Sequence, residues 1–172
     1  MDYFQGVVTE YLRAKRSVFI NTEFLISLDE GKLKKGRHWY CDALAVDMKD
    51  RCVSLCEITY SANPHALVSR LIAWRSCWRE IGDAIRRDSG VPEDWSLQPW
   101  VFLPKRYEDV FQSKFPGFSE LSSDETQMPN PLITHLESIL PWEYLLTWDR
   151  KVDHFAMKET KTKVSHQQVI PI

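Results

Sequence analysis

Residues 37–61 read RHWYCDALAVDMKDRCVSLCEITYS, and this stretch decides the fold. Two apolar, β-rich runs, 39–46 and 52–60, flank a polar break, a pattern that predicts a β-hairpin. With a loop of either two or four residues, the same register results, and it places Asp42 opposite Glu57. Opposed residues point to the same face of a hairpin, with Cβ atoms roughly 4.5–5.5 Å apart. The spacing therefore predicts two facing carboxylates.

This pair of carboxylates needs an explanation, because acidic side chains are costly to bury. Thr59 lies two residues beyond Glu57 and so shares its face of the strand. Two carboxylates amid apolar neighbours repel each other and lose their hydration. A bound cation, a nearby Arg or Lys, or a shared proton would relieve the cost. The residues alone leave these three remedies open.

Composition describes a globular chain without a global attraction for nucleic acid. Of 172 residues, 44% are hydrophobic and 27% charged, and the net charge is −2. We expect one domain over residues 1–148, followed by a polar, flexible tail over residues 149–172. A near-neutral chain can bind nucleic acid only through a local basic face.

Cysteine placement and the start of the chain predict a cytoplasmic protein. The four Cys fall in predicted strands and a helix, without CxxC spacing, which favours buried, reduced thiols over a zinc site. The start has neither a basic segment nor an apolar one, so we expect no secretory signal. No apolar run of about 18 residues occurs, which predicts no membrane span.

The elements around the hairpin follow from periodicity. Residues 2–16 repeat apolar side chains at helical spacing, with Glu10 at the edge of the apolar stripe. A strand is expected over 17–28, then a basic loop that carries Lys34 and Lys35. One long amphipathic helix should start at Asn63-Pro64 and end near Asp88-Ser89-Gly90, with a strand over 98–104 after it and helices over 107–115 and 131–140. The polar face of the long helix carries Arg70, Arg75, Arg79, Arg86 and Arg87.

The order helix, three strands, helix, strand, with Asp42 on the second strand and Glu57 and Thr59 on the third, resembles the PD-(D/E)xK nuclease superfamily. The resemblance covers roughly residues 2–104. It implies an α/β fold with a restriction-endonuclease-like αβββαβ core, a mixed sheet flanked by helices. Residues 105–148 would then be a C-terminal helical addition.

The resemblance also implies a function. Asp42 matches the family's Asp, Glu57 the acidic residue of its (D/E)xK half-motif, and Glu10 the acidic residue often found on its first helix. These three would bind Mg²⁺ or Mn²⁺, and the protein would be a metal-dependent nuclease hydrolysing phosphodiester bonds in DNA or RNA. Residues that would contact the nucleic acid are Lys34, Lys35, Arg37, Arg70 and Arg75.

Two departures from the family pattern keep alternatives open. Cys41-Asp42 replaces Pro-Asp, and Thr59 stands where the family has Lys, so it can position water or phosphate but brings no positive charge. Arg70, or a lysine of the loop, would have to supply that charge. Otherwise the chain is a catalytically degenerate member of the fold that binds nucleic acid or protein, or the two carboxylates are strand residues paired with Arg or Lys. The Trp-rich segment 141–148 is a further candidate surface for a protein partner.

Overall fold

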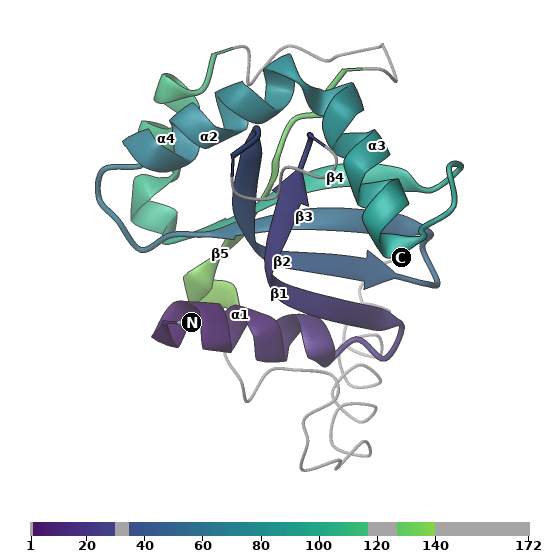
Figure 1. Cartoon of the computed structure of the whole chain (residues 1–172). Helices are drawn as coiled ribbons and strands as arrows, with labels where there is room; N and C mark the ends of the chain where they lie inside the picture. Colours follow the sequence, from purple (N-terminus) through teal and green to yellow (C-terminus); the bar gives the residue numbers. More distant parts are fainter. Residues whose placement is uncertain (1, 30–34, 117–126, 140–172) are drawn as a thin grey trace, which may run out of the picture.

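A five-stranded mixed sheet lies between helices in a computed structural model that describes residues 2–29, 35–116 and 127–139 (Figure 1). The strands follow one another across the sheet in chain order. The first three are antiparallel neighbours, and the last two add in parallel. The chain is therefore α/β, as the element order predicts. The strands are β1 Val18–Ser27, β2 His38–Asp47, β3 Cys52–Ile58, β4 Ser96–Leu103 and β5 Leu132–His135.

Helices cover the two faces of the sheet unequally. Helix α1 lies across one face, and α2 and α3 lie across the other (Figure 1). Asp2 caps α1: its Oδ1 accepts a hydrogen bond from the Gln5 backbone amide, and its own backbone amide donates one to Gln5 Oε1. The helical elements are α1 Tyr3–Arg13, α2 His65–Ser76, α3 Trp78–Ser89, α4 Glu108–Lys114 and the short 3₁₀ turns η1 Lys105–Tyr107 and η2 Leu136–Ser138.

The hairpin register is confirmed. Asp47 pairs with Cys52 across a four-residue turn, and the ladder continues to the pair Ala43 and Cys56. Asp47 stabilises the turn, because its Oδ1 accepts hydrogen bonds from the amides of Lys49 and Asp50. The regular pairing stops one pair short of Asp42 and Glu57, where side chains take over.

A sharp bend in β1 and β2 causes this stop. The two strands pair on both sides of Glu23 and Asp42 but not at that pair, and Glu23 has a positive φ of 55°. Cys41 and Leu44 consequently face the same core although they are three residues apart. Beyond the bend, the end of β1 and the start of β2 rise together past α2 and α3 (Figure 1). Asp42 therefore sits at the corner, where its side chain leaves the strict alternation of the strand.

Each face of the sheet carries its own hydrophobic core. Leu55 and Val101 pack with Leu71 and Trp74 of α2 on one face, while Cys56 packs with residues of α1 on the other. Alternation along β3 thus turns Glu57 toward α2, as it does Leu55. The core on the α1 side consists of Val8, Leu12, Ala43, Ala45, Cys56, Phe102, Leu136 and Ile139.

The expected long helix is wrong in one respect: it is interrupted at Cys77, which separates α2 from α3. Ser76 Oγ and Cys77 Sγ both donate to the carbonyl oxygen of Ala73, at 2.8 and 3.0 Å. Short polar side chains that bond to a preceding carbonyl compete with the helical backbone ladder. The expected end at Gly90 is confirmed, since Gly90 takes the left-handed conformation with φ 69°.

The helix expected over residues 131–140 is also wrong, because Leu132–His135 form β5. Ile133 and Thr134 are β-branched, and they pair in parallel with Val101 and Phe102 of β4. A neighbouring strand with open hydrogen-bonding groups outweighed a weak helical spacing. The described part of the C-terminal addition is therefore strand and short helix together. The segments 141–148 and 149–172 lie outside the described residues.

Candidate active site

Asp42 holds two elements together at the bend. Its Oδ1 accepts a hydrogen bond from Gln5 Nε2 of α1 at 2.9 Å, and its Oδ2 accepts one from the Ile58 amide at 2.7 Å. The Ile58 amide would otherwise lack a ladder partner, so Asp42 completes the end of β3. The carboxylate is thereby fixed beside Glu57, the neighbour of Ile58 in the chain.

Glu57 is the most deeply buried acidic side chain near this corner. The residue is 3% exposed, and its Oε2 accepts a hydrogen bond from Arg70 Nη1. Its other oxygen, Oε1, is buried without a hydrogen-bond partner among the described residues. A buried carboxylate oxygen that lacks a donor is costly, and it is a ready ligand for a cation.

Arg70 supplies the positive charge at the pair. It lies on α2, and besides Glu57 its Nη1 contacts the carbonyl oxygen of Tyr40 at 3.4 Å. The side chain stays 34% exposed, so it connects the buried carboxylate to solvent. Of the three remedies that the sequence leaves open, an arginine partner is therefore present.

The electrostatics of the pair follow from burial and like charge. The pKa of Glu57 is raised to about 8, chiefly by burial and further by the charge of Asp42, against the opposing effect of Arg70. Burial also raises the pKa of Asp42, but less, because the hydrogen bonds from Ile58 and Gln5 oppose it. The two carboxylates thus differ, with Asp42 the readier to carry charge.

Thr59 lies beyond the end of β3, where the chain leaves the sheet. Its amide donates to the carbonyl oxygen of Phe102 at 2.9 Å, which keeps it beside β4. Its Oγ1 accepts from the Ser61 amide at 3.2 Å, and no described group takes up its hydroxyl hydrogen. Thr59 is half-buried, so this hydrogen can be donated to a molecule that approaches the corner.

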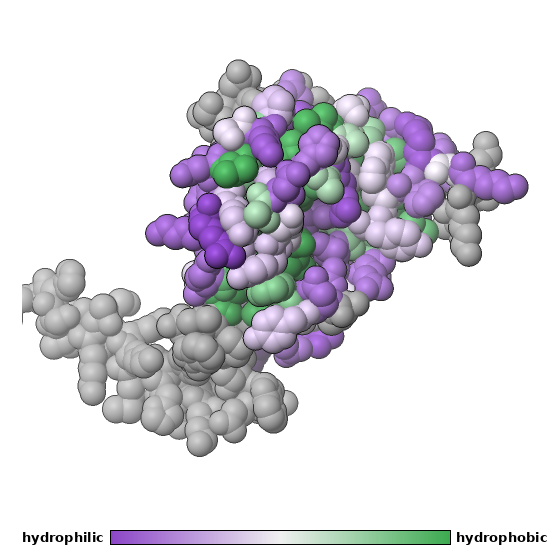
Figure 2. All heavy atoms as spheres, turned by 90° about the vertical axis from the view of Figure 1, so that its left-hand side faces the viewer, coloured by the Kyte–Doolittle hydropathy of each residue, from purple (hydrophilic) through white to green (hydrophobic). Residues whose placement is uncertain are grey.

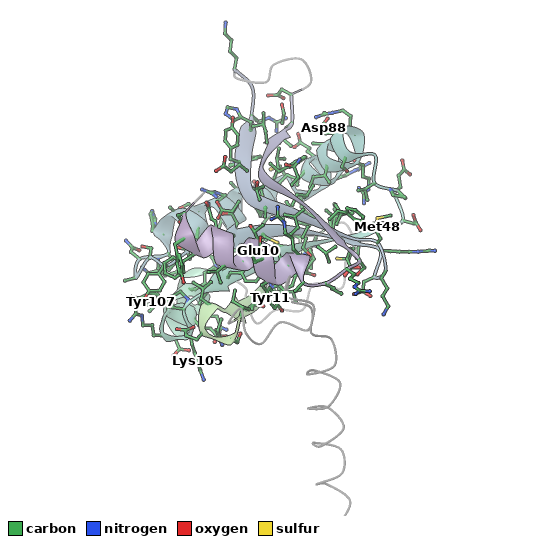
Figure 3. All side chains as sticks on the ribbon, turned by 90° about the horizontal axis from the view of Figure 1, so that it is seen from below. Glu10, Tyr11, Met48, Asp88, Lys105 and Tyr107 are labelled. Atoms are coloured by element: carbon green, nitrogen blue, oxygen red, sulfur yellow. The ribbon has the colours of Figure 1, made fainter. Side chains whose placement is uncertain are left out.

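Glu10, expected as a third metal ligand, is not brought to this corner. Its carboxylate accepts a hydrogen bond from Arg13 at 2.9 Å on the exposed surface, and Figure 3 places it midway along α1. It lies five residues from Gln5, which is about 7.5 Å along the helix and on another side of it. Gln5 is the α1 side chain that reaches Asp42.

The basic residues expected to contact nucleic acid lie in separate parts of the structure. Arg37, just before β2, pairs with Asp29 and Glu80, and Lys35 is exposed near it in the chain. Arg75 lies over the Phe115 ring, 4.1 Å from its centre, and donates to the carbonyl oxygen of Pro116. Of the expected basic residues that the structure describes, Arg70 alone contacts an expected carboxylate. Lys34 lies outside the described residues.

A divalent metal ion fits this donor set in part. Within residues 2–29, 35–116 and 127–139, no three His, Cys, Asp or Glu side chains gather closely enough to hold a metal ion. Two carboxylates remain, and one of their oxygens is buried and unpartnered. Mg²⁺ is commonly held by one or two carboxylates, with water and substrate phosphate completing its shell. Asp42 and Glu57 are compatible with that mode.

Gln5 and Tyr60 are the residues near the corner whose placement the sequence does not indicate. Gln5 contributes to the helix cap, and nothing in the apolar spacing of α1 points its side chain at Asp42. Tyr60 directly follows Thr59, and its ring stacks on that of Phe4, with ring centres 4.3 Å apart. The spacing of apolar residues identifies core positions, whereas these contacts depend on the bend.

No family model matches this chain, and no curated protein sequence does. In the part of the chain that the structure describes, no helix has the length and apolar character needed to cross a membrane.

Proposed function

We propose that this chain has a restriction-endonuclease-like core and hydrolyses phosphodiester bonds in DNA or RNA with the help of Mg²⁺ or Mn²⁺. The observation that carries the proposal is the corner of β2 and β3, where a buried carboxylate with an unpartnered oxygen lies beside Asp42. Most buried side-chain oxygens in proteins have a hydrogen-bond partner, so an unpartnered one beside a second carboxylate favours a bound ligand.

Asp42 and Glu57 would hold the metal ion in this proposal. When bound, the ion would polarise the scissile phosphate and lower the pKa of an attacking water. Arg70 would orient the phosphate, because a guanidinium carries several donors in a fixed plane and only one is used on Glu57. Thr59 would donate its hydroxyl hydrogen to the water or to a phosphate oxygen. Gln5 would keep Asp42 in place.

Cleavage assays on single- and double-stranded DNA and RNA test the proposal, with Mg²⁺, Mn²⁺ or EDTA present. We expect metal-dependent cleavage by the wild type and a loss of at least about a hundredfold in Asp42→Asn and Glu57→Gln. Glu10→Gln is the matched control, since it neutralises an exposed carboxylate outside the corner and should cleave at the wild-type rate. Cleavage that survives both site changes contradicts the assignment.

A second candidate is a catalytically degenerate member of the same fold that binds nucleic acid. The ion pair between Arg70 and Glu57 favours it, because the arginine already supplies the charge that a metal ion would otherwise bring. This candidate predicts binding that is equal in EDTA and Mg²⁺, with no cleavage in either. Arg70→Gln separates the two: it should weaken a binding module but should raise the metal affinity of the enzyme, because Glu57 loses its competing partner.

A further inference from the structure

Five side chains next to the candidate active site form a continuous chain of contacts, which we call the aromatic ladder. It consists of Tyr3, Phe4, Tyr60, Arg106 and Tyr107. Tyr3 meets the Phe4 ring edge-on at 5.3 Å, and Phe4 stacks on Tyr60 with an interplanar angle of 8°. Arg106 donates to the Tyr60 hydroxyl at 3.2 Å, and its guanidinium lies 4.7 Å from the centre of the Tyr107 ring.

Burial accounts for only part of the aromatic ladder: Phe4 and Tyr107 are half-buried against the hydrophobic cores, whereas the other members are exposed. Tyr3 is 77% exposed and Tyr60 49% exposed, and Arg106 is exposed as well. Rings that merely anchor α1 on the sheet would be covered, as Phe102 is. Phe4 covers one face of the Tyr60 ring, and the Arg106 guanidinium lies 5.4 Å from its centre. The surface open to a further planar group is therefore the Tyr3 ring and the exposed remainder of Tyr60.

The ladder adjoins the carboxylate corner through the chain itself. Phe4 precedes Gln5, which holds Asp42, and Tyr60 follows Thr59 at the end of β3. Arg106 lies in η1, directly after β4. In Figure 3 the labelled Lys105 and Tyr107 lie at the end of the molecule where α1 begins. Figure 2 looks onto that side, where weakly polar and apolar residues run between strongly hydrophilic ones.

Positive charge accompanies the rings. Neither Lys105 nor Arg106 forms an ion pair with a described residue, although both are exposed. Glu137 lies beside them: the Lys105 amide donates to its carboxylate at 3.0 Å, and the charge of Arg106 helps to lower its pKa. Two exposed cations without an ion-pair partner among the described residues, beside aromatic rings, match the chemistry of a nucleotide, which offers a phosphate next to a planar base.

We propose that the aromatic ladder binds unpaired bases of single-stranded DNA or RNA. Bases in a duplex stack on each other and present only their edges, whereas a single strand can place a base on an exposed ring. Stacking tolerates every base, so this surface would select strandedness rather than sequence. That the bound strand is then led to Asp42 and Glu57 for cleavage rests on the proposed function.

Binding in EDTA tests the ladder separately from cleavage. The probes are fluorescent oligo(dT), oligo(rU) and a blunt DNA duplex, and the readout is the dissociation constant by anisotropy. We expect the wild type to prefer the single strands over the duplex. Tyr60→Leu should weaken single-strand binding by about 5- to 100-fold, the range typical of losing one stacked base. Tyr60→Phe should retain most of the affinity.

Matched controls keep the test decisive. Phe19→Leu removes another exposed ring, 65% exposed on β1 and outside the ladder, and should bind like the wild type. Tyr3→Ser changes the outermost ring, whose exposure makes misfolding an inadequate explanation, and should also weaken binding. Equal affinities of wild type, Tyr60→Leu and Tyr3→Ser overturn the inference, as does a duplex bound as tightly as oligo(dT).

The outcomes for the two proposals are distinguishable. Single-strand binding that depends on Tyr60, without metal-dependent cleavage, supports the ladder and overturns the proposed hydrolysis. Metal-dependent cleavage lost in Asp42→Asn, with single-strand affinity unchanged in Tyr60→Leu, supports the hydrolysis and overturns the ladder. Wild-type binding to an unrelated acidic polypeptide as tightly as to oligo(dT) also overturns it, because it would reflect charge alone.

Discussion

Glu57→Gln should change how the stability of the protein depends on pH. The carboxyl group has an ordinary pKa of 4.5 and a pKa raised to about 8 in the folded protein, chiefly because it is buried. The folded state therefore holds this proton more tightly than the unfolded state. The contribution to stability is complete below pH 4.5 and is lost as the pH rises through 8. Glutamine has no proton to lose, so the variant lacks this loss.

The size of the effect follows from the difference between the two pKa values. A change from 4.5 to about 8 corresponds to at most about 5 kcal/mol, since a tenfold change in proton affinity is about 1.4 kcal/mol. The site can relax around the ionised carboxylate, so we expect about 2–3 kcal/mol. In a chain of this length, that is a relative rise in the melting temperature of at least about 4 °C.

Thermal unfolding in EDTA between pH 5 and pH 8.5 measures the effect. The melting temperature of Glu57→Gln minus that of the wild type should increase with pH, whatever its value at pH 5. A constant offset from the lost contact with Arg70 cancels in this comparison. Glu10→Gln is the control, because its carboxylate is exposed and should give a difference that does not change over this range. Parallel curves for wild type and Glu57→Gln would refute the reasoning.

Two further predictions concern stability away from the corner. Asp47→Asn should lower the free energy of unfolding by about 1.5–3 kcal/mol at pH 7. Burial raises the pKa of Asp47, but hydrogen bonds from Lys15 and backbone amides outweigh it and hold the pKa below its ordinary value. This contribution exists above the pKa of the unfolded chain, so urea unfolding at pH 3 should show a smaller loss of stability. Gly90→Ala should lower the free energy of unfolding by about 1–2 kcal/mol, since φ there is 69° and no neighbour crowds the site. Gly6→Ala, equally uncrowded but inside α1, should raise it by about 1 kcal/mol. Calorimetry that gives both changes the same sign would contradict this.

The hairpin and its register could be predicted because they depend on local information. The alternation of apolar residues, the polar break and the even loop fix which residues oppose one another, and the pairs from Ala43 and Cys56 to Asp47 and Cys52 follow. The layers of the fold follow similarly, since strand and helix periods differ. Local patterns cannot predict the bend at Glu23, where β1 and β2 are unpaired at one position and the alternation of their side chains between the two faces of the sheet is interrupted.

The errors have a common physical origin in competition between local preference and distant partners. Leu132–His135 carry a spacing that suits a helix, but the open edge of β4 offers backbone partners that no local pattern registers. The break at Cys77 is the reverse case. There the carbonyl oxygen of Ala73 accepts hydrogen bonds from two short side chains in the same turn, and apolar periodicity does not indicate such bonds.

The bend also explains why the acidic residue expected from the first helix is replaced by an amide. Because the corner turns Asp42 toward the start of α1, the reachable position is Gln5 in the first turn, not Glu10 in the third. A third carboxylate there would add repulsion to a pair that already raises the pKa of Glu57. An amide donates a hydrogen bond instead and favours the charged form of Asp42. The corner thus leaves negative charge more favourable on Asp42 while Glu57 keeps an unpartnered oxygen, and the metal ion that we propose would satisfy both.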